Sequence, residues 1–196
     1  MIAWQMKEKI RQALASRRKE KISDRGLSQA AVLVPLLCKG GEYHILFTRR
    51  SNQVAHHKGQ VSFPGGAFSE GDCSLLDTAL RESWEEIGLE AGDVEILGEL
   101  DDTPTVSSGF AISPFVALIP YPYEFKVSHE EIDEIFDVPI SALLSKAKVR
   151  QESRVVLGEI VTAFSYEYGG RVIWGATAGI VKQFLEIWQS ASGAQC

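Results

Sequence analysis

Cysteine is scarce in this chain. The 196 residues include three cysteines, Cys38, Cys73 and Cys196. Disulfide frameworks use an even number of cysteines, and cysteine-based metal sites place two of them close together in the sequence. Neither condition holds here, so the sequence argues against a disulfide scaffold and a structural zinc site, and it favours a reducing cytoplasm.

Long apolar runs and a surplus of basic residues are also missing. No stretch approaches the roughly 20 apolar residues that span a bilayer, and the N-terminus lacks the apolar core of a signal peptide. The formal net charge is −6, whereas a nucleic-acid-binding protein needs a basic surface to neutralise phosphates. The sequence therefore predicts no membrane partner and no nucleic-acid partner, and it leaves a homodimer open.

The hydrophobic content of 45% is enough for one sizeable core. Because no linker, repeat or low-complexity tract divides the chain, we expect a single domain over residues 1–196. Residues 1–21 predict an amphipathic helix packed on that domain. Its apolar residues recur on one face, at Ile2, Met6, Ile10 and Leu14.

The rest of the chain alternates short strands with helices. Apolar runs and turn signals predict strands at residues 30–37, 43–49, 61–63, 94–100, 112–119, 154–157 and 160–168. Helices are expected at residues 74–87 and 174–190, a short helical turn after Pro139, and an acidic surface segment at residues 129–137. Mixed strands flanked by helices indicate layered α/β packing.

Residues 81–89, Arg-Glu-Ser-Trp-Glu-Glu-Ile-Gly-Leu, are the most informative stretch. On a helix with about 3.6 residues per turn, Glu82, Glu85 and Glu86 point the same way. Like charges on one face destabilise a helix, so this arrangement favours neutralisation from outside by a divalent metal. An acidic solvated face is the alternative interpretation. The strand and glycine loop at residues 59–66, directly upstream, favour the metal.

The run from Gly66 to Leu89 resembles the Nudix box, the signature of hydrolases that cleave nucleoside diphosphates linked to another group. The matching residues are Arg81, Glu82, Glu85, Glu86, Gly88 and Leu89. The preceding loop is one residue longer than the general pattern, and Cys73 holds the position of an early Glu, with Asp72 and Glu70 nearby. The resemblance implies an α/β/α sandwich with a mixed central sheet, here with an extra N-terminal helix.

A second resemblance is to the coenzyme A diphosphatase branch of the Nudix family. It is carried by residues 46–51, His57, residues 59–61 and 63–66, with further similar stretches at 109–116, 131–139 and 173–178. One departure is Ala55, which stands where the branch usually has an Arg. The resemblance implies hydrolysis of coenzyme A, or an acyl derivative, to 3′,5′-ADP and 4′-phosphopantetheine or its acyl form.

The chemistry of a diphosphate indicates roles for the motif residues. Its anionic oxygens repel a nucleophile, so a catalyst must neutralise charge and activate water, and carboxylates that hold Mg²⁺ or Mn²⁺ do both. We expect Glu82 and Glu86 to be metal ligands, with Glu85 completing the metal site and contributing to catalysis. Arg81 is expected to fasten Glu85, four residues further along the helix, and Gly88 is expected to end the helix.

Other candidate residues lie outside the helix. Glu131 is the predicted general base, with Glu134 as a second candidate, although an acidic solvated run explains both equally well. Gly65 and Gly66 let the loop backbone approach a phosphate, and a plain tight turn is the other explanation. A cationic cluster precedes this loop and suits anionic substrate groups: Arg49, Arg50, His56, His57 and Lys58, with Arg50, His57 and Lys58 as predicted substrate-binding residues.

Two other functions stay open on the sequence. One is a neighbouring Nudix specificity, for ADP-ribose, a dinucleotide or a nucleoside triphosphate. The other is a catalytically silent Nudix-like module that senses a nucleotide. The presence of Glu82, Glu85 and Glu86 together disfavours the silent module, because pure binding does not need all three.

Overall fold

The computed structural model describes residues 2–24, 26–53, 58–105, 108–145, 149–156 and 159–193. In chain order its elements are α1 (Ile2–Ala15), β1 (Ser28–Lys39), β2 (Glu42–Arg50), β3 (Val61–Ser62), β4 (Gly65–Ala67), α2 (Leu75–Ile87), the 3₁₀ helix η1 (Ala91–Asp93), β5 (Glu95–Glu99), β6 (Thr103–Pro104), β7 (Phe110–Leu118), β8 (Ile132–Pro139), α3 (Ile140–Leu144), β9 (Val149–Val156), β10 (Glu159–Tyr168), β11 (Arg171–Trp174) and α4 (Gly175–Ser192).

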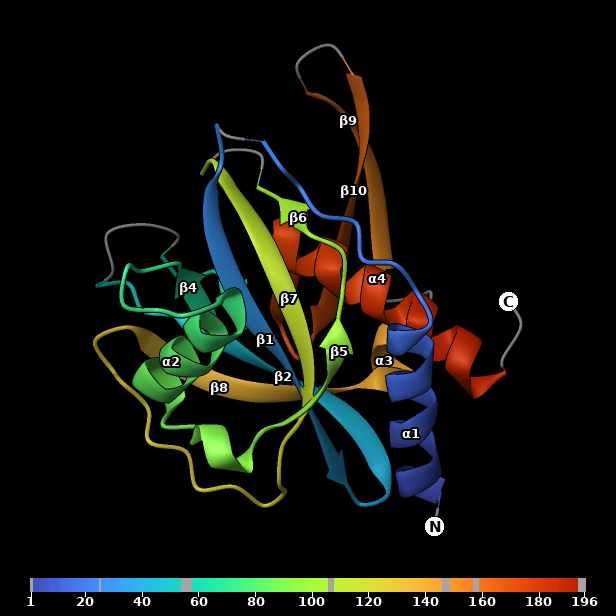
Figure 1. Ribbon diagram of the computed structural model, residues 1–196. Coiled ribbons are helices and arrows are strands. Elements are labelled where there is room, and N and C mark those ends of the chain that lie inside the picture. The colour runs from blue at the N-terminus through green and yellow to red at the C-terminus, as the bar shows by residue number, and fades with distance from the viewer. Residues whose placement is uncertain are drawn as a thin grey trace.

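Two sheets form from the described strands. The larger sheet has eight strands, follows the order β3-β2-β1-β7-β5, and adds β4 against β1, β6 against β7 and β8 against β2. Strands β1 and β7 are parallel, whereas the other pairs in this sheet are antiparallel. The central sheet is therefore mixed, as predicted. The smaller sheet is antiparallel in the order β11-β10-β9, and its β9–β10 hairpin projects from the body of the molecule (Figure 1).

Helices cover both faces of the larger sheet (Figure 1). Successive residues of a strand point to opposite faces, so alternate residues of β1 enter two different cores. One core joins α2 to the sheet and includes Ala31, Leu33, Ala79, Ile87, Phe115 and Ala117. The other joins α1 and α4 to the opposite face and includes Ile10, Leu14, Val34, Leu36, Val116, Val181 and Phe184. This α/β/α layering, with the added helix α1, confirms the predicted fold class.

The predicted N-terminal helix is too long. Helix α1 ends at Ala15, and the chain beyond it follows the β5–β6 edge without helical structure. The amide of Glu20 donates to Asp101 Oδ1 at 2.7 Å, and the amide of Ile22 donates to Asp102 Oδ2 at 3.0 Å. Lys19 pairs with Asp102 at 3.0 Å. These long-range contacts outweigh the helical periodicity, because helix propensity is a weak preference that tertiary contacts override.

The prediction of an acidic surface segment at residues 129–137 is also wrong in part. Most of it belongs to β8, which pairs antiparallel with β2, and Ile132 and Val138 are buried there. Two acidic residues of this strand have basic partners: Asp137 contacts Lys39 and His44, and Glu134 pairs with Arg49 and Arg171. The acidic composition of this segment led to the prediction of a surface segment instead of a strand, because the partners of its acidic residues lie far away in the sequence. The short strands β4, β6 and β11 were not predicted, and β9 begins earlier than expected.

The described helices were compared with the length and apolar composition that crossing a bilayer requires. Among the described residues, no helix meets both conditions.

Candidate active site

Helix α2 begins and ends at local sequence signals. The side chain of Ser74 accepts the Asp77 amide at 3.2 Å, which satisfies one of the free amides of the first turn. At the other end, Gly88 adopts a left-handed conformation with φ of 66°. A side chain is strained at that φ, so glycine is a natural residue with which to end the helix. These caps fix which helix turn carries Glu82, Glu85 and Glu86.

Glu86 is the buried carboxylate of this helix, with 1% of its surface exposed. The amide of Gly65 donates to its Oε2 at 3.2 Å, and Arg50 Nη1 lies 3.4 Å from its Oε1. The pKa of Glu86 is raised to about 8, mainly by burial and to a smaller extent by the negative charges of Glu82 and Glu131, although Arg50 and the Gly65 amide lower it. Loss of solvation is therefore the main reason why this carboxyl holds its proton, and a cation bound beside it would favour the ionised form.

Glu82 lies against the glycine loop. A Cβ atom built on Gly66 would lie 2.4 Å from Glu82 Cδ, so any side chain at residue 66 would displace this carboxylate. Burial raises the pKa of Glu82, although its contact with Arg81 acts in the opposite direction. Gly65 and Gly66 thus bring the loop backbone onto the two carboxylates of α2, one by a hydrogen bond and the other by close packing.

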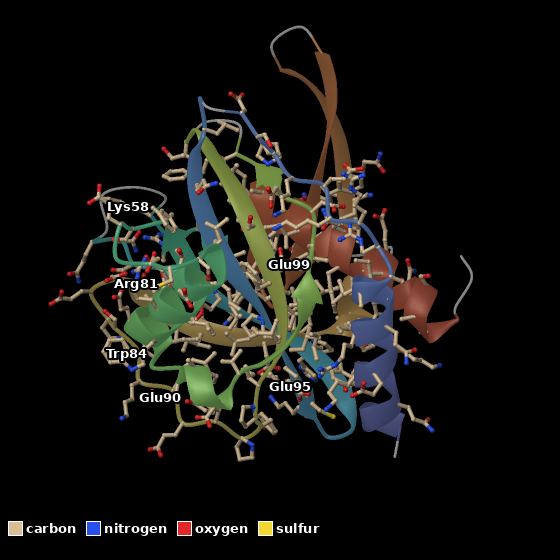
Figure 2. The ribbon with its side chains drawn as sticks, in the orientation of Figure 1. Lys58, Arg81, Trp84, Glu90, Glu95 and Glu99 are labelled. Atoms are coloured by element: carbon tan, nitrogen blue, oxygen red, sulfur yellow. The ribbon has the colours of Figure 1, made fainter. Side chains whose placement is uncertain are left out.

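Arg81 connects the acidic face of α2 to the loop before it (Figure 2). Its Nη1 donates to Glu82 Oε1 at 2.8 Å and to Glu85 Oε2 at 3.0 Å. Its Nε and Nη2 donate to the two oxygens of Asp72 at 2.8 and 3.1 Å. Sequence reasoning paired Arg81 with Glu85 and gave no role to Asp72. The one-residue-longer loop hid this partner, because the motif register placed Cys73 at the acidic position.

Glu131 reaches the same site from the segment before β8. This segment folds over the end of α2, where Lys126 N donates to the Ile87 carbonyl at 3.0 Å and Ser128 N donates to the Glu86 carbonyl at 2.9 Å. The negative charge of Glu131 acts on both Glu82 and Glu86 and raises their pKa values. Glu131 therefore lies within electrostatic range of the acidic face of α2.

Glu134, the second candidate for a general base, is held by arginines. It forms ion pairs with Arg171 and with Arg49, whose Nε lies 3.5 Å away. The hydrogen bonds from Arg171 lower the pKa of Glu134. Its neighbour Phe136 carries the Arg171 guanidinium over its ring, at 4.6 Å from the centroid. Glu134 thus joins β8 to β2 and β11, apart from the carboxylates of α2.

The predicted cationic cluster is divided by the structure. Arg50 faces Glu86, whereas Arg49, its neighbour in β2, pairs with Glu134. Lys58 is exposed in the turn that leads to β3 (Figure 2). His57, the predicted substrate-binding histidine, lies outside the described residues together with His56 and Ala55.

Comparison with known proteins places this site in a family. Residues 27–157 match the NUDIX domain. A relative from Yersinia enterocolitica, called uncharacterized Nudix hydrolase NudL, is 36% identical over 157 residues, which cover 80% of each chain. This chain belongs to the Nudix family. Another NudL protein, from Yersinia pestis, is 35% identical over 81% of this chain and 78% of its own. The protein is thus a Nudix hydrolase.

Solved structures support the Nudix fold. A MutT/nudix family protein from Enterococcus faecalis aligns with a TM-score of 0.54 at 16% identity and covers 98% of this chain and 80% of its own. An Ap4A hydrolase from C. elegans aligns with a TM-score of 0.50 at 17% identity, over 60% of this chain and 84% of its own. At these identities the likeness shows the fold alone.

Nudix hydrolases generally need a divalent metal ion, and the donor set of this chain suits one. In the described part of the chain, no three acidic, histidine or cysteine side chains converge as a finished cation site. Arg50 and Arg81 pair with the carboxylates of α2 instead. The oxygen donors nonetheless match Mg²⁺ or Mn²⁺. A bound cation would stabilise the ionised form of Glu86, whose pKa burial raises to about 8 in the metal-free protein. Glu82 and Glu86 therefore fit a hard divalent cation in charge and donor type.

Proposed function

We propose that this Nudix hydrolase cleaves the diphosphate of coenzyme A or an acyl derivative, with Mg²⁺ or Mn²⁺ as its metal. The observation that carries the metal-dependent reaction is the meeting of Glu82 and Glu86 with the backbone of Gly65 and Gly66. Water adds to one phosphorus, the bridging P–O bond breaks, and the products are 3′,5′-ADP and 4′-phosphopantetheine or its acyl form.

The proposed roles follow from where each side chain lies. Glu82 and Glu86 would hold the cation, with Glu85 completing the set from the exposed side of α2. The bound cation supplies charge neutralisation and makes water more acidic. Glu131 would accept the proton of the attacking water, because it lies within electrostatic range of Glu82 and Glu86 while Glu134 is engaged by Arg171.

Arg50 is the cation best placed to contact the diphosphate. It lies beside Glu86, and its side chain is 27% exposed. The planar guanidinium, with several donors, is suited to phosphate oxygens. Lys58, exposed in the turn before the glycine loop, would reach an outer anionic group such as the 3′-phosphate of coenzyme A.

The coenzyme A assignment rests on the sequence stretch at residues 46–66, and Ala55 within it favours a second candidate. The branch usually has an Arg there, so its replacement by Ala removes a phosphate contact and favours a substrate with fewer phosphates, such as ADP-ribose. Coenzyme A carries a 3′-phosphate that ADP-ribose lacks, so the two substrates separate the alternatives.

The test is a steady-state comparison of coenzyme A, 3′-dephospho-coenzyme A and ADP-ribose, each with Mg²⁺ and with Mn²⁺. A charge-assisted contact contributes about 1.5–3 kcal/mol, or roughly tenfold to a hundredfold in specificity. We expect kcat/KM for the dephospho form to be at least about tenfold lower, and the double variant His57→Ala, Lys58→Ala to narrow that gap. Lys182→Ala, which removes a lysine paired with Glu186 on α4, is the matched control. Equal or better cleavage of ADP-ribose by the wild type would refute the coenzyme A assignment.

A further inference from the structure

Trp174, the last residue of β11, is a large apolar side chain that the fold leaves exposed. Its exposed fraction is 51%, whereas its neighbour Ile173 is fully buried. Gly175, the next residue, is also exposed, and a Cβ built on it would meet nothing within 4 Å. The indole ring is therefore accessible to a ligand, with open space beside the backbone that carries it.

The neighbours of Trp174 in β11 determine which way its ring faces. Successive residues of a strand point to opposite faces, and Ile173 enters the core beneath α1 and α4. Arg171 shares the face of Ile173. It pairs with Glu134 and lies over the ring of Phe136, which packs on the same core. Trp174 therefore faces away from this core, and α2 lies on that other side of the larger sheet.

Strand β11 also brings Trp174 close to the glycine loop of the candidate active site. It packs beside β3, and the Thr177 hydroxyl, at the start of α4, donates to the Val61 carbonyl of β3 at 3.3 Å. Strand β3 leads into the loop that contains Gly65, and it pairs with the end of β2 that leads to Arg50. Trp174 thus borders the site on its β3 side.

This position suits the nucleobase of the substrate. Coenzyme A and ADP-ribose both carry adenine, joined through one ribose to the diphosphate. With the diphosphate at Arg50 and the carboxylates of α2, the base lies to one side of them, where Trp174 offers an exposed aromatic face. Bases stack on such a face, and removal of the ring typically weakens binding by about fivefold to a hundredfold. The pantetheine arm is flexible, so ordering it on an exposed ring would cost more entropy.

We propose that Trp174 is the specificity residue for the nucleobase, and that its indole ring stacks on the adenine of the substrate. The inference deepens the proposed function and rests on its active site, but it holds for coenzyme A and ADP-ribose alike. Stacking is made equally in the ground state and in the transition state, so it contributes to KM and not to kcat.

The experiment measures the Kd of four reaction products by isothermal titration calorimetry in Mg²⁺. Two of them carry adenine: 3′,5′-ADP, from coenzyme A, and AMP, from ADP-ribose. Their partners, 4′-phosphopantetheine and ribose 5-phosphate, lack a base. For Trp174→Ala we expect the Kd of the adenine products to rise about tenfold and that of the base-free products to change less than about twofold. Trp174→Phe, which keeps an aromatic face, should raise the Kd of the adenine products less than about threefold.

Trp84→Ala is the matched control. Trp84 is 55% exposed, but it lies about 200° around α2 from Glu82, on the side opposite the acidic face. This variant should bind all four products as the wild type does. For the substrate that the wild type cleaves, Trp174→Ala should raise KM about tenfold and change kcat less than about threefold, whereas Trp84→Ala should change neither.

Unchanged affinity of Trp174→Ala for the adenine products would overturn the proposal. A matching loss for the base-free products would overturn it too, because Trp174 would then act on another part of the substrate or on the fold. If Trp174→Ala does not fold, as judged by circular dichroism, Trp174→Leu carries the test, since it keeps apolar bulk without an aromatic face. Binding of AMP but not of 3′,5′-ADP to the wild type would refute coenzyme A alone, because the AMP titration still decides the role of Trp174. A wild type that binds neither adenine product would overturn the proposal.

Discussion

Replacing Glu86 by glutamine removes a deeply buried ionisable carboxyl group and keeps the shape of the side chain. In the metal-free protein, burial raises the pKa of Glu86 from 4.5 to about 8. The unfolded chain releases this proton near pH 4.5, whereas the folded chain keeps it until about pH 8. Stability is therefore full below pH 4.5 and falls as the pH rises toward 8. At pH 7 the loss is about 3 to 4 kcal/mol, from roughly 2.5 pH units at about 1.4 kcal/mol each.

We expect Glu86→Gln to recover most of this free energy of unfolding. At pH 7 in EDTA, the variant should be more stable by about 3 kcal/mol, or roughly 6 to 12 °C in Tm for a chain of this length. The difference should shrink toward pH 4.5. Differential scanning calorimetry between pH 4.5 and 8 provides the measurement. A variant that is no more stable than the wild type at pH 7 would show that the burial argument is wrong.

Loss of the ionisable carboxyl, which stabilises Glu86→Gln, should also remove its activity. Without the charge, Glu86→Gln cannot hold a cation strongly, so turnover at saturating Mg²⁺ should fall by orders of magnitude. Added Mn²⁺ should raise the Tm of the wild type, by mass action, and should leave the Tm of the variant almost unchanged. Near-normal turnover of folded Glu86→Gln would remove α2 from the mechanism.

Two further substitutions test the surroundings of the site. Gly66→Ala should abolish most hydrolysis, because its Cβ would lie 2.4 Å from Glu82 Cδ. The control is Gly71→Ala in the same loop, whose Cβ meets nothing within 4 Å and which should keep its activity. Equal kinetics for the two variants would refute the packing argument. Glu134→Gln should keep most of its kcat and lose about 1 kcal/mol of stability at pH 7, because it breaks a half-buried ion pair with Arg171. The folded pKa of Glu134 is lowered, so this stability difference should vanish as the pH falls below 4.5. A large loss of kcat in Glu134→Gln would return this residue to the list of catalytic candidates.

Local sequence signals predict helix α2, but they do not predict the residues with which its side chains pair. Ser74, the 3.6-residue period and Gly88 all act within the helix or at its ends, so its bounds follow from sequence. The pairing of Arg50 with Glu86 joins residues 36 positions apart, and no local pattern indicates it. Asp72 was missed for a related reason, since a loop with an extra residue has no fixed register until it folds against Arg81.

The distinction between Glu131 and Glu134 also needed the fold. In sequence both belong to one acidic run, but β8 begins at Ile132, between them. Glu131 lies in the segment that caps α2, whereas Glu134 faces Arg49 across the β2–β8 pair. An acidic run gives no sign of where a strand begins, because that start depends on pairing with β2.

The central position of β1 determines which part of the molecule is slowest to open. Strand β1 is paired with β7 along one edge and with β2 and β4 along the other, and its side chains enter both cores. Its amides can therefore exchange with deuterium only when both helix layers separate from the sheet, which amounts to global unfolding. A bound nucleotide would protect these amides only through its effect on overall stability. Local protection caused by the ligand would instead be visible at the Gly65–Gly66 loop, and an exchange map could locate the substrate without an activity assay.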